Sequence, residues 1–246
     1  MSDLNGKRAL VTGAARGIGA GIARALADKG ADVAITYERS ADRAAELVKE
    51  LQQKGRRAVA IQADSADPAA VKRSVEEAAK ALGGLDILVN NAGIARGGAF
   101  VDTSLEDIDA QLNVNVRAAL LASQAAIPHL KAGGRIVTIG SNVAERVPFG
   151  GLTVYAMSKS ALLSFTRGLA RELGPSEITV NLVQPGPIDT DMNPVDGELA
   201  KTVGGFTALG RYGKTSDIGN AVAFLASPAA NFITGSALTV DGGLNA

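Results

Sequence analysis

Strand-like and helix-like patterns of hydrophobic residues alternate along the whole chain. This alternation constrains the fold more than any other feature. Seven short runs rich in β-branched and apolar residues have the composition of buried strands. Segments with apolar residues at helical spacing, such as Ile18, Ile22 and Leu26, separate these runs. Repeated strand–helix units form right-handed crossovers around one parallel sheet. The strands are expected at residues 8–12, 32–36, 58–62, 86–90, 135–140, 178–183 and 236–240.

This pattern predicts a Rossmann-type α/β fold, a seven-stranded parallel sheet between two helical layers, in a single domain spanning residues 1–246. No linker, low-complexity stretch or repeat divides the chain. A long helix is expected from near Thr153 to the Gly174-Pro175 pair. Residues 185–214 have the least pattern, so we expect a mobile loop there.

Composition excludes several classes of function. The 25 Lys and Arg residues balance 25 Asp and Glu residues, which argues against nucleic acid as a partner. The chain has no cysteine and one histidine, His129, so disulfides, thiolate chemistry and a histidine zinc site are not expected. Residues 218–240 carry no charge, but Pro228 and Gly235 interrupt them, which favours a helix, a turn and a strand over a membrane span. No basic, apolar leader opens the chain, and we expect a cytoplasmic protein.

The run from Thr12 to Gly19 follows the first expected strand and opens the first helix. Its glycines, Gly13, Gly17 and Gly19, permit a tight turn and a close approach of backbone to a pyrophosphate. The free N–H groups and positive end of the helix would face the phosphates. The spacing differs from the common dinucleotide fingerprint, so a tight turn without a ligand remains an alternative.

Polar residues follow later strands at the same sheet edge. Asn91-Ala92-Gly93 comes after the fourth expected strand and Ser141 after the fifth. Tyr155 and Lys159 are four residues apart on the next helix, so their side chains share one face. A free tyrosine has a pKa of about 10, and a nearby cation would lower that pKa toward the working range. A buried tyrosine with a solvent-reaching lysine is the plainer alternative, but the joint occurrence of these motifs favours a catalytic site.

These motifs, in this order, resemble those of the short-chain dehydrogenase/reductase superfamily, from about Lys7 to the C-terminus, and the overall pattern is most similar to 3-oxoacyl-carrier-protein reductases. The resemblance implies that Tyr155 donates a proton to a carbonyl oxygen and that Ser141 orients this oxygen. Lys159 would lower the pKa of Tyr155 and bind the nicotinamide ribose. The family's catalytic asparagine falls on Asn113 or Asn115, and the local context favours Asn115. No metal is implied.

The resemblance also implies a nucleotide cofactor, with Ile188 and Thr190 at the nicotinamide and Asp64 at the adenine. Asp64 as a simple helix cap and residues 185–190 as a rigid proline turn are the alternatives. The expected cofactor-binding residues are Gly13, Arg16, Gly17, Ile18, Gly19, Tyr37, Arg39, Ser40, Ala63, Asp64, Ser65, Asn91, Ala92, Gly93, Tyr155, Lys159, Pro185, Gly186, Ile188 and Thr190.

The end of the second expected strand predicts that NADP(H) is preferred and that NAD(H) is the weaker alternative. Tyr37 stands where NAD-binding relatives carry an acid. Arg39 and Ser40 could donate hydrogen bonds to a 2′-phosphate, and Arg16 could reach it from the glycine turn. Glu38 argues for NAD(H), unless its side chain turns away from the ribose.

The leading hypothesis is therefore an NADPH-dependent enzyme that reduces a ketone or aldehyde of a small molecule to an alcohol. Carrier-bound 3-oxoacyl substrates are an alternative, although Ala132, Ser176 and Glu177 stand where carrier-binding relatives place arginines. A non-catalytic nucleotide-binding regulator is the alternative from another class. We expect a mostly apolar substrate pocket and a homotetramer paired through residues 118–127 and the helix after Tyr155. The pocket residues would be Val143, Val147, Phe149, Leu152, Met192 and Phe206.

Overall fold

Seven parallel strands form one sheet in the computed structural model, which describes residues 3–197 and 200–246. The spatial order is β3-β2-β1-β4-β5-β6-β7, and it reverses direction between β1 and β4. This reversal creates a crevice at the carboxyl ends of the strands, where open α/β sheets bind ligands. The predicted fold class is confirmed, and each strand boundary agrees with its expectation to within two residues. The strands are β1 (Arg8–Val11), β2 (Asp32–Tyr37), β3 (Ala58–Gln62), β4 (Ile87–Asn90), β5 (Arg135–Ile139), β6 (Thr179–Pro185) and β7 (Ala237–Val240).

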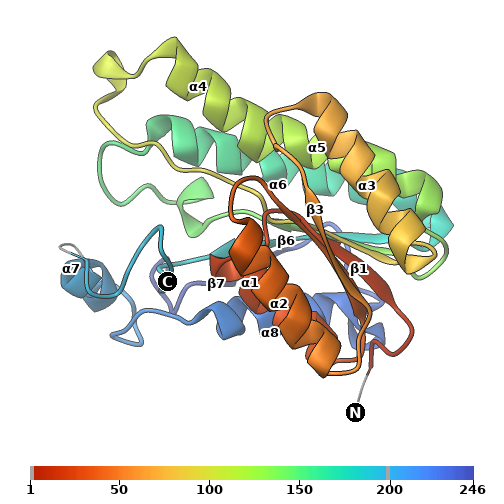
Figure 1. Cartoon of the computed structure of the whole chain (residues 1–246). Helices are drawn as coiled ribbons and strands as arrows, with labels where there is room; N and C mark the ends of the chain where they lie inside the picture. Colours follow the sequence, from red (N-terminus) through yellow and green to blue (C-terminus); the bar gives the residue numbers. More distant parts are fainter. Residues whose placement is uncertain (1–2, 198–199) are drawn as a thin grey trace.

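Helices cover both faces of this sheet (Figure 1). On one face lie α1 (Gly17–Asp28), α2 (Ala41–Gln53) and α8 (Thr215–Ala226), packed around a core that includes Leu26 and Val222. On the other face lie α3 (Pro68–Leu82), α4 (Leu105–Leu112), α5 (Ala118–Ala126) and α6 (Thr153–Leu173). Val75 and Ala122 belong to the core beneath this second layer. The long helix predicted from Thr153 is α6, and it ends immediately before Gly174.

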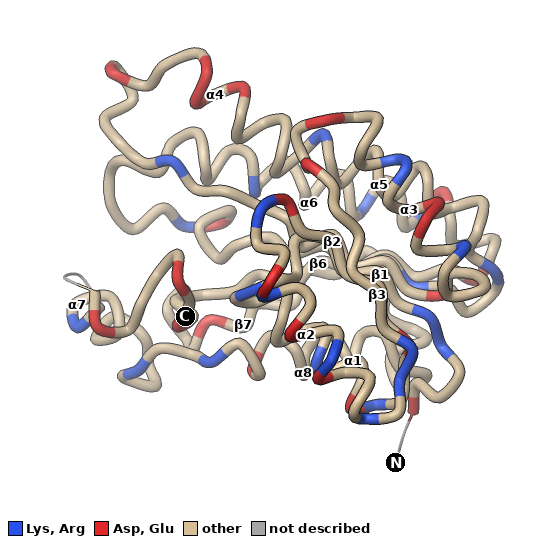
Figure 2. Tube along the Cα trace, viewed as in Figure 1, with Lys and Arg blue, Asp and Glu red and all other residues tan. Residues whose placement is uncertain are grey.

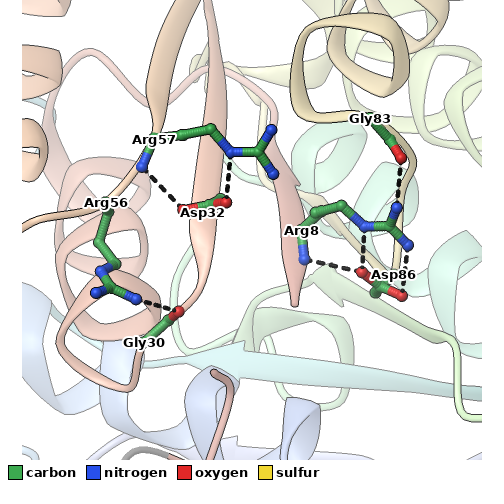
Figure 3. A network of polar contacts seen from close by, with 7 residues as sticks. All are labelled: Arg8, Gly30, Asp32, Arg56, Arg57, Gly83 and Asp86. Atoms are coloured by element: carbon green, nitrogen blue, oxygen red, sulfur yellow. Dashed lines mark hydrogen bonds and ion pairs between the residues drawn. The ribbon is translucent and has the colours of Figure 1, made fainter. Parts of the chain in front are cut away.

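Ion pairs hold the amino ends of neighbouring strands together (Figure 3). Arg8, at the start of β1, places its Nε 2.7 Å from a carboxylate oxygen of Asp86, directly before β4. Asp32 at the start of β2 accepts two hydrogen bonds from Arg57, directly before β3, both at 2.8 Å. These pairs lie at the amino edge, opposite the edge that carries the glycine turn.

The segment after β6 is more structured than its sequence pattern predicts. It contains the short helix α7 (Ala200–Gly205), and Ile188 forms a parallel bridge with Gly213. Lys and Arg are mixed with Asp and Glu on both helical layers (Figure 2). Within residues 3–197 and 200–246, no helix has the length and apolar character needed to cross a bilayer. The same residues hold no cluster of His, Asp and Glu side chains suited to a metal ion.

Candidate active site

The glycine turn after β1 is interlocked with the segment that follows β4. Gly13 has a φ of +62°, and a Cβ atom there would lie 2.9 Å from the Cα of Ala92. The Asn91 side chain donates hydrogen bonds to the carbonyl oxygens of Thr12, at 2.8 Å, and of Gly13, at 3.1 Å. The Thr12 hydroxyl in turn accepts the backbone N–H groups of Asn91 and Ala92. These contacts fix the turn at the switch point of the sheet, and they require glycine there whether or not a ligand binds.

The first turn of α1 has the features of an anion-binding helix end. The helix begins at Gly17, its preceding residue Arg16 makes no capping hydrogen bond, and no acidic residue lies in the first turn. The free N–H groups of such an end favour a negatively charged ligand. Thr190, in the loop after β6, lies 3.5 Å from the position of a Cβ atom on Gly17. The turn and this loop therefore face one another across the crevice.

Tyr155 and Ser141 are brought together from α6 and the end of β5. Ser141 is buried, and its hydroxyl also accepts the N–H of Val143 at 3.4 Å. Burial raises the pKa of the Tyr155 phenol, and the polar side chain of Ser141 only partly offsets that rise. The sequence instead predicts a Tyr155 pKa that is lowered by Lys159. The Lys159 Nζ lies 6.0 Å from the centre of the Tyr155 ring, and burial determines the direction instead.

Lys159 is a buried cation held by the backbone. Its Nζ donates a 2.9 Å hydrogen bond to the carbonyl oxygen of Ile139, the last residue of β5. Burial lowers the pKa of Lys159 to about 8. A lysine with this pKa is a mixture of charged and neutral forms near neutral pH, which suits a group that handles protons.

Asn115 lies in a widened, π-helical turn at Asn113–Arg117, between α4 and α5. Its buried side-chain amide accepts the N–H of Ile94 at 2.8 Å and donates to the Ile94 carbonyl at 2.9 Å. It also donates to the Ser158 hydroxyl at 2.9 Å, which ties it to α6. In the described part of the chain, Asn113 makes no side-chain hydrogen bond of this kind. The geometry therefore favours Asn115 between the two candidates.

Gly93 keeps the space between Lys159 and Asn115 open. A Cβ atom on Gly93 would lie 3.2 Å from the Lys159 Nζ and 3.4 Å from the Asn115 Oδ1. A side chain here would crowd both polar groups. The glycine thus leaves a surface on which a ligand could approach them, and the residues present fit a dinucleotide laid along the strand ends.

The adenosine side of the crevice lies beside β2 and β3. Ala63 donates its N–H to the carbonyl of Tyr37 at 2.8 Å, which joins the ends of these two strands. Asp64 accepts the N–H of Ala66 at 2.7 Å in a local turn, whereas the cap of α3 is Asp67. Ala63 and Ser65 line a small pocket together with Thr12, Thr36, Val71, Ser74, Asn90, Ala92, Ala118, Ala119 and Ala122.

The arginines near this side differ in what they contact. Arg39 pairs with Glu38 at 2.7 Å, and its side chain is 88% exposed. Ser40 precedes α2 without a capping hydrogen bond. Arg16 instead pairs with Asp191 at 3.1 Å, and Arg43 in the first turn of α2 pairs with the same carboxylate. The sequence gives no indication of Arg43 and Asp191, because only their ion pair in the folded chain identifies them.

The remaining candidate residues lie at the mouth of the crevice or away from it. Pro185 ends β6, and the N–H of Gly186 donates to Val240 at 3.0 Å. The single histidine, His129, contacts Glu76 at 2.9 Å and, in the part of the chain that the structure describes, makes no side-chain hydrogen bond to Ser141, Tyr155 or Lys159. Of the apolar residues expected around the substrate, four are exposed: Val147, Phe149, Met192 and Phe206. The other two are Val143, which is buried, and Leu152, which is half-buried.

Comparison with known proteins places the chain in a family. The family model described as enoyl-(acyl carrier protein) reductase matches residues 13–245. A short-chain dehydrogenase from Burkholderia cenocepacia, solved in complex with NADP, is 59% identical, with a TM-score of 0.98 and coverage of 99% of this chain and 100% of that one. With its glycine turn, Ser141, Tyr155 and Lys159, the chain belongs to the short-chain dehydrogenase/reductase superfamily of oxidoreductases.

Two curated relatives carry different functional names. A cyclic-di-GMP-binding biofilm dispersal mediator protein of Escherichia coli is 43% identical over 246 residues, which is all of both chains. A versicolorin reductase of Emericella nidulans is 40% identical over 253 residues, covering 98% of this chain and 96% of the relative. The family is therefore established, whereas the substrate is a matter for inference.

Proposed function

We propose that this protein is an NADPH-dependent reductase that converts the carbonyl group of a small, largely apolar ketone or aldehyde to an alcohol. The observation that carries the proposal is that Lys159 lies 6.0 Å from the centre of the Tyr155 ring, is hydrogen-bonded to the strand end before Ser141, and borders the open surface at Gly93. The NADP-bound relative supports the choice of cofactor. When bound, the cofactor supplies the hydride.

The protein's own groups handle the proton and the carbonyl oxygen. Tyr155, whose pKa is raised, is protonated at neutral pH and donates its phenolic proton to the oxygen as negative charge develops there. The Ser141 hydroxyl donates a hydrogen bond to the same oxygen and fixes its position. Lys159 then stabilises the phenolate, and Asn115 holds the surrounding helix and loop in place.

We infer that the cofactor would lie along the carboxyl ends of the strands. The turn at Gly13, Gly17, Ile18 and Gly19 would hold the pyrophosphate through N–H groups. The adenosine would contact Tyr37, Ala63, Asp64 and Ser65, and residues 91–93 and 185–190 would line the rest of the site. The opposed positions of Gly17 and Thr190 support this arrangement.

The substrate we favour is a free small molecule rather than an acyl chain on a carrier protein. Val147, Phe149, Met192 and Phe206, in the segments that follow β5 and β6, expose apolar side chains that would suit an apolar substrate. A carrier protein is acidic, and Ser176 and Glu177 offer it no positive charge. A relative named as a versicolorin reductase is consistent with a small-molecule substrate.

A nucleotide-binding regulator is the second candidate, favoured by one observation. The Escherichia coli relative, which is 43% identical over all of both chains, is named for cyclic-di-GMP binding. The retained Ser141, Tyr155 and Lys159 argue for catalysis, because a protein that only binds a nucleotide needs no proton donor. The two candidates differ in whether a carbonyl compound causes NADPH to be consumed.

We also propose a cytoplasmic homotetramer of single-domain chains spanning residues 1–246. Leu120 on α5 and Met157 on α6 expose apolar surface, and so do Phe224 on α8 and Leu238 on β7. Two separate apolar faces suit the two kinds of interface that a dihedral tetramer needs. Light scattering at micromolar concentration should give the mass of four chains, and the mass of one chain would contradict the proposal.

The direct experiment mixes the purified protein with NADPH and a panel of ketones and aldehydes of increasing apolar size. We expect NADPH consumption with at least one compound, and none with the Tyr155→Phe variant. Binding of cyclic-di-GMP is measured in parallel by calorimetry. Tight binding of that nucleotide without NADPH consumption by any compound would favour the regulator.

A further inference from the structure

Asp191 joins two arginines that are distant from it in sequence. It lies in the loop after β6, one residue beyond Thr190. Its carboxylate accepts a hydrogen bond from Arg16 at 3.1 Å, and the same oxygen accepts one from Arg43. Arg16 directly precedes α1 and Arg43 lies in the first turn of α2. Three separate elements of the fold therefore meet at one carboxylate.

The two guanidinium groups outnumber the single carboxylate that they contact. The hydrogen bonds from Arg43 and then Arg16 hold the pKa of Asp191 below its usual range, so this carboxylate carries one negative charge at neutral pH. Arg43 and Arg16 carry two positive charges, and their side chains are 55% and 56% exposed. Each guanidinium has five N–H donors, of which the single contact uses one. Such a pair can still bind a stronger anion.

The location of the pair fits the adenosine end of a dinucleotide. Arg16 and Arg43 line a hollow between α1 and α2, together with Ala15, Gly17, Ala20, Arg24, Glu46, Leu47 and Glu50. This hollow adjoins the glycine turn and follows the end of β2, where relatives read the ribose. Arg39, which the sequence pattern favours together with Arg16, is paired with Glu38 instead.

We propose that Arg43 joins Arg16, already expected from the glycine turn, in binding the 2′-phosphate of NADP(H), and that Asp191 is a specificity-determining residue whose carboxylate competes with this phosphate for the same two arginines. The proposal deepens the proposed function, since it rests on NADP(H) as the cofactor. It also links cofactor choice to the loop after β6, which carries Thr190 and Met192.

The competition follows from charge and hydrogen bonding. A phosphate monoester brings close to two negative charges and three acceptor oxygens, against one charge and two oxygens for a carboxylate. The phosphate therefore displaces the Asp191 carboxylate from the two arginines. Breaking the Asp191 contacts costs free energy, which reduces the net affinity for the phosphate. NADH has no 2′-phosphate, so it leaves the Asp191 contacts intact and is unaffected by the competition.

The test measures dissociation constants by calorimetry for 2′,5′-ADP, which carries the 2′-phosphate, and for 5′-AMP, which does not. We expect Asp191→Asn to bind 2′,5′-ADP about 3- to 10-fold more tightly than the unmodified protein, with 5′-AMP changed less than 2-fold. Arg43→Gln should weaken 2′,5′-ADP about 10-fold. Arg39→Gln, the matched control, should change it less than 3-fold.

The double variant Arg43→Gln/Asp191→Asn should lose most of the gain seen in Asp191→Asn, because the competition requires Arg43. Weaker 2′,5′-ADP binding by Asp191→Asn, or an equal change for both nucleotides, would overturn the role of Asp191. An Arg39→Gln loss larger than that of Arg43→Gln would overturn the assignment of Arg43. These readouts need no turnover, so a protein that shows the expected binding but reduces no carbonyl compound contradicts only the proposed reductase activity.

Discussion

The Nζ of Lys159 donates a 2.9 Å hydrogen bond to the backbone carbonyl of Ile139, two residues before Ser141. This bond connects α6, which carries Tyr155, to the strand end that carries Ser141. The spacing of the catalytic groups is therefore set by the same contact that holds the lysine. Because the contact is buried, it also places a charge where the protein solvates it poorly.

Replacing Lys159 by Met should stabilise the protein at pH 7. The pKa of Lys159 is about 8 in the folded chain against an ordinary value of 10.5, so burying its charge costs up to about 3 kcal/mol below pH 8. The unfolded chain binds more protons between these two values, and the cost disappears as the pH rises through that interval. We expect a gain of about 1–3 kcal/mol in the free energy of unfolding at pH 7, measured in urea, that shrinks by pH 10. Lys80→Met, on the exposed face of α3, is the control; an equal gain there would refute the explanation.

Replacing Tyr155 by Phe should reduce turnover at least about 100-fold and leave NADPH affinity within about 3-fold, because only the proton donor is removed. The measurement is steady-state kinetics with the best substrate, accompanied by NADPH fluorescence titration. Turnover close to that of the unmodified protein would exclude Tyr155 as the donor.

Asn115 and Asn113 should respond very differently to alanine. Asn115→Ala removes the hydrogen bonds to Ile94 and Ser158 and should lower kcat about 10- to 100-fold. It should also cost about 1–3 kcal/mol of stability, because buried partners are left unpaired. Asn113→Ala serves as the matched control and should change kcat by less than about 3-fold. A larger kcat loss for Asn113→Ala would reverse the assignment.

The ion pair of Arg8 and Asp86 should make the free energy of unfolding depend on pH in the acidic range. Burial opposes ionisation of Asp86, but hydrogen bonds from Arg8 and the charges of Arg8 and Lys7 outweigh it, so the pKa of Asp86 is lowered. The resulting stabilisation is fully present above the unfolded pKa of about 4 and is lost as the pH falls through the lower folded value. Asp86→Asn should cost about 1–3 kcal/mol at pH 7 and less at pH 3. The exposed Asp102→Asn variant should show neither effect, and an unchanged difference at pH 3 would exclude this origin.

Much of the fold follows from local pattern, and the site follows only in part. Buried strands such as β5 are short runs rich in β-branched residues, and the helix after Thr153 ends at a Gly-Pro pair, so their limits are visible in the sequence. Ser141 and Tyr155 could be placed at one edge because strand ends meet there. The direction of the Tyr155 pKa shift could not be predicted from the sequence, because it depends on burial by elements that are far apart in the chain.

The arginines at the adenosine end of the cofactor site could also be predicted only in part. The sequence pattern favours Arg39, which lies two residues beyond the end of β2, whereas Arg43 lies one helical turn further on. The contact between Arg43 and Asp191 spans 148 positions and has no local signature. Sequence position indicates a region of the molecule, and the contacts of the folded chain lead us to propose Arg43 rather than Arg39 within it.

Transfer of labelled hydride tests the central claim most directly. NADPH carrying deuterium on either face of nicotinamide C4 is incubated with the protein and a ketone that it consumes, and the alcohol is analysed by mass spectrometry. The account predicts deuterium on the carbinol carbon from only one of the two labelled forms, with product formation abolished in Tyr155→Phe. Alcohol without deuterium from either form, or equal labelling from both, would contradict a reductase that holds cofactor and carbonyl in one fixed geometry.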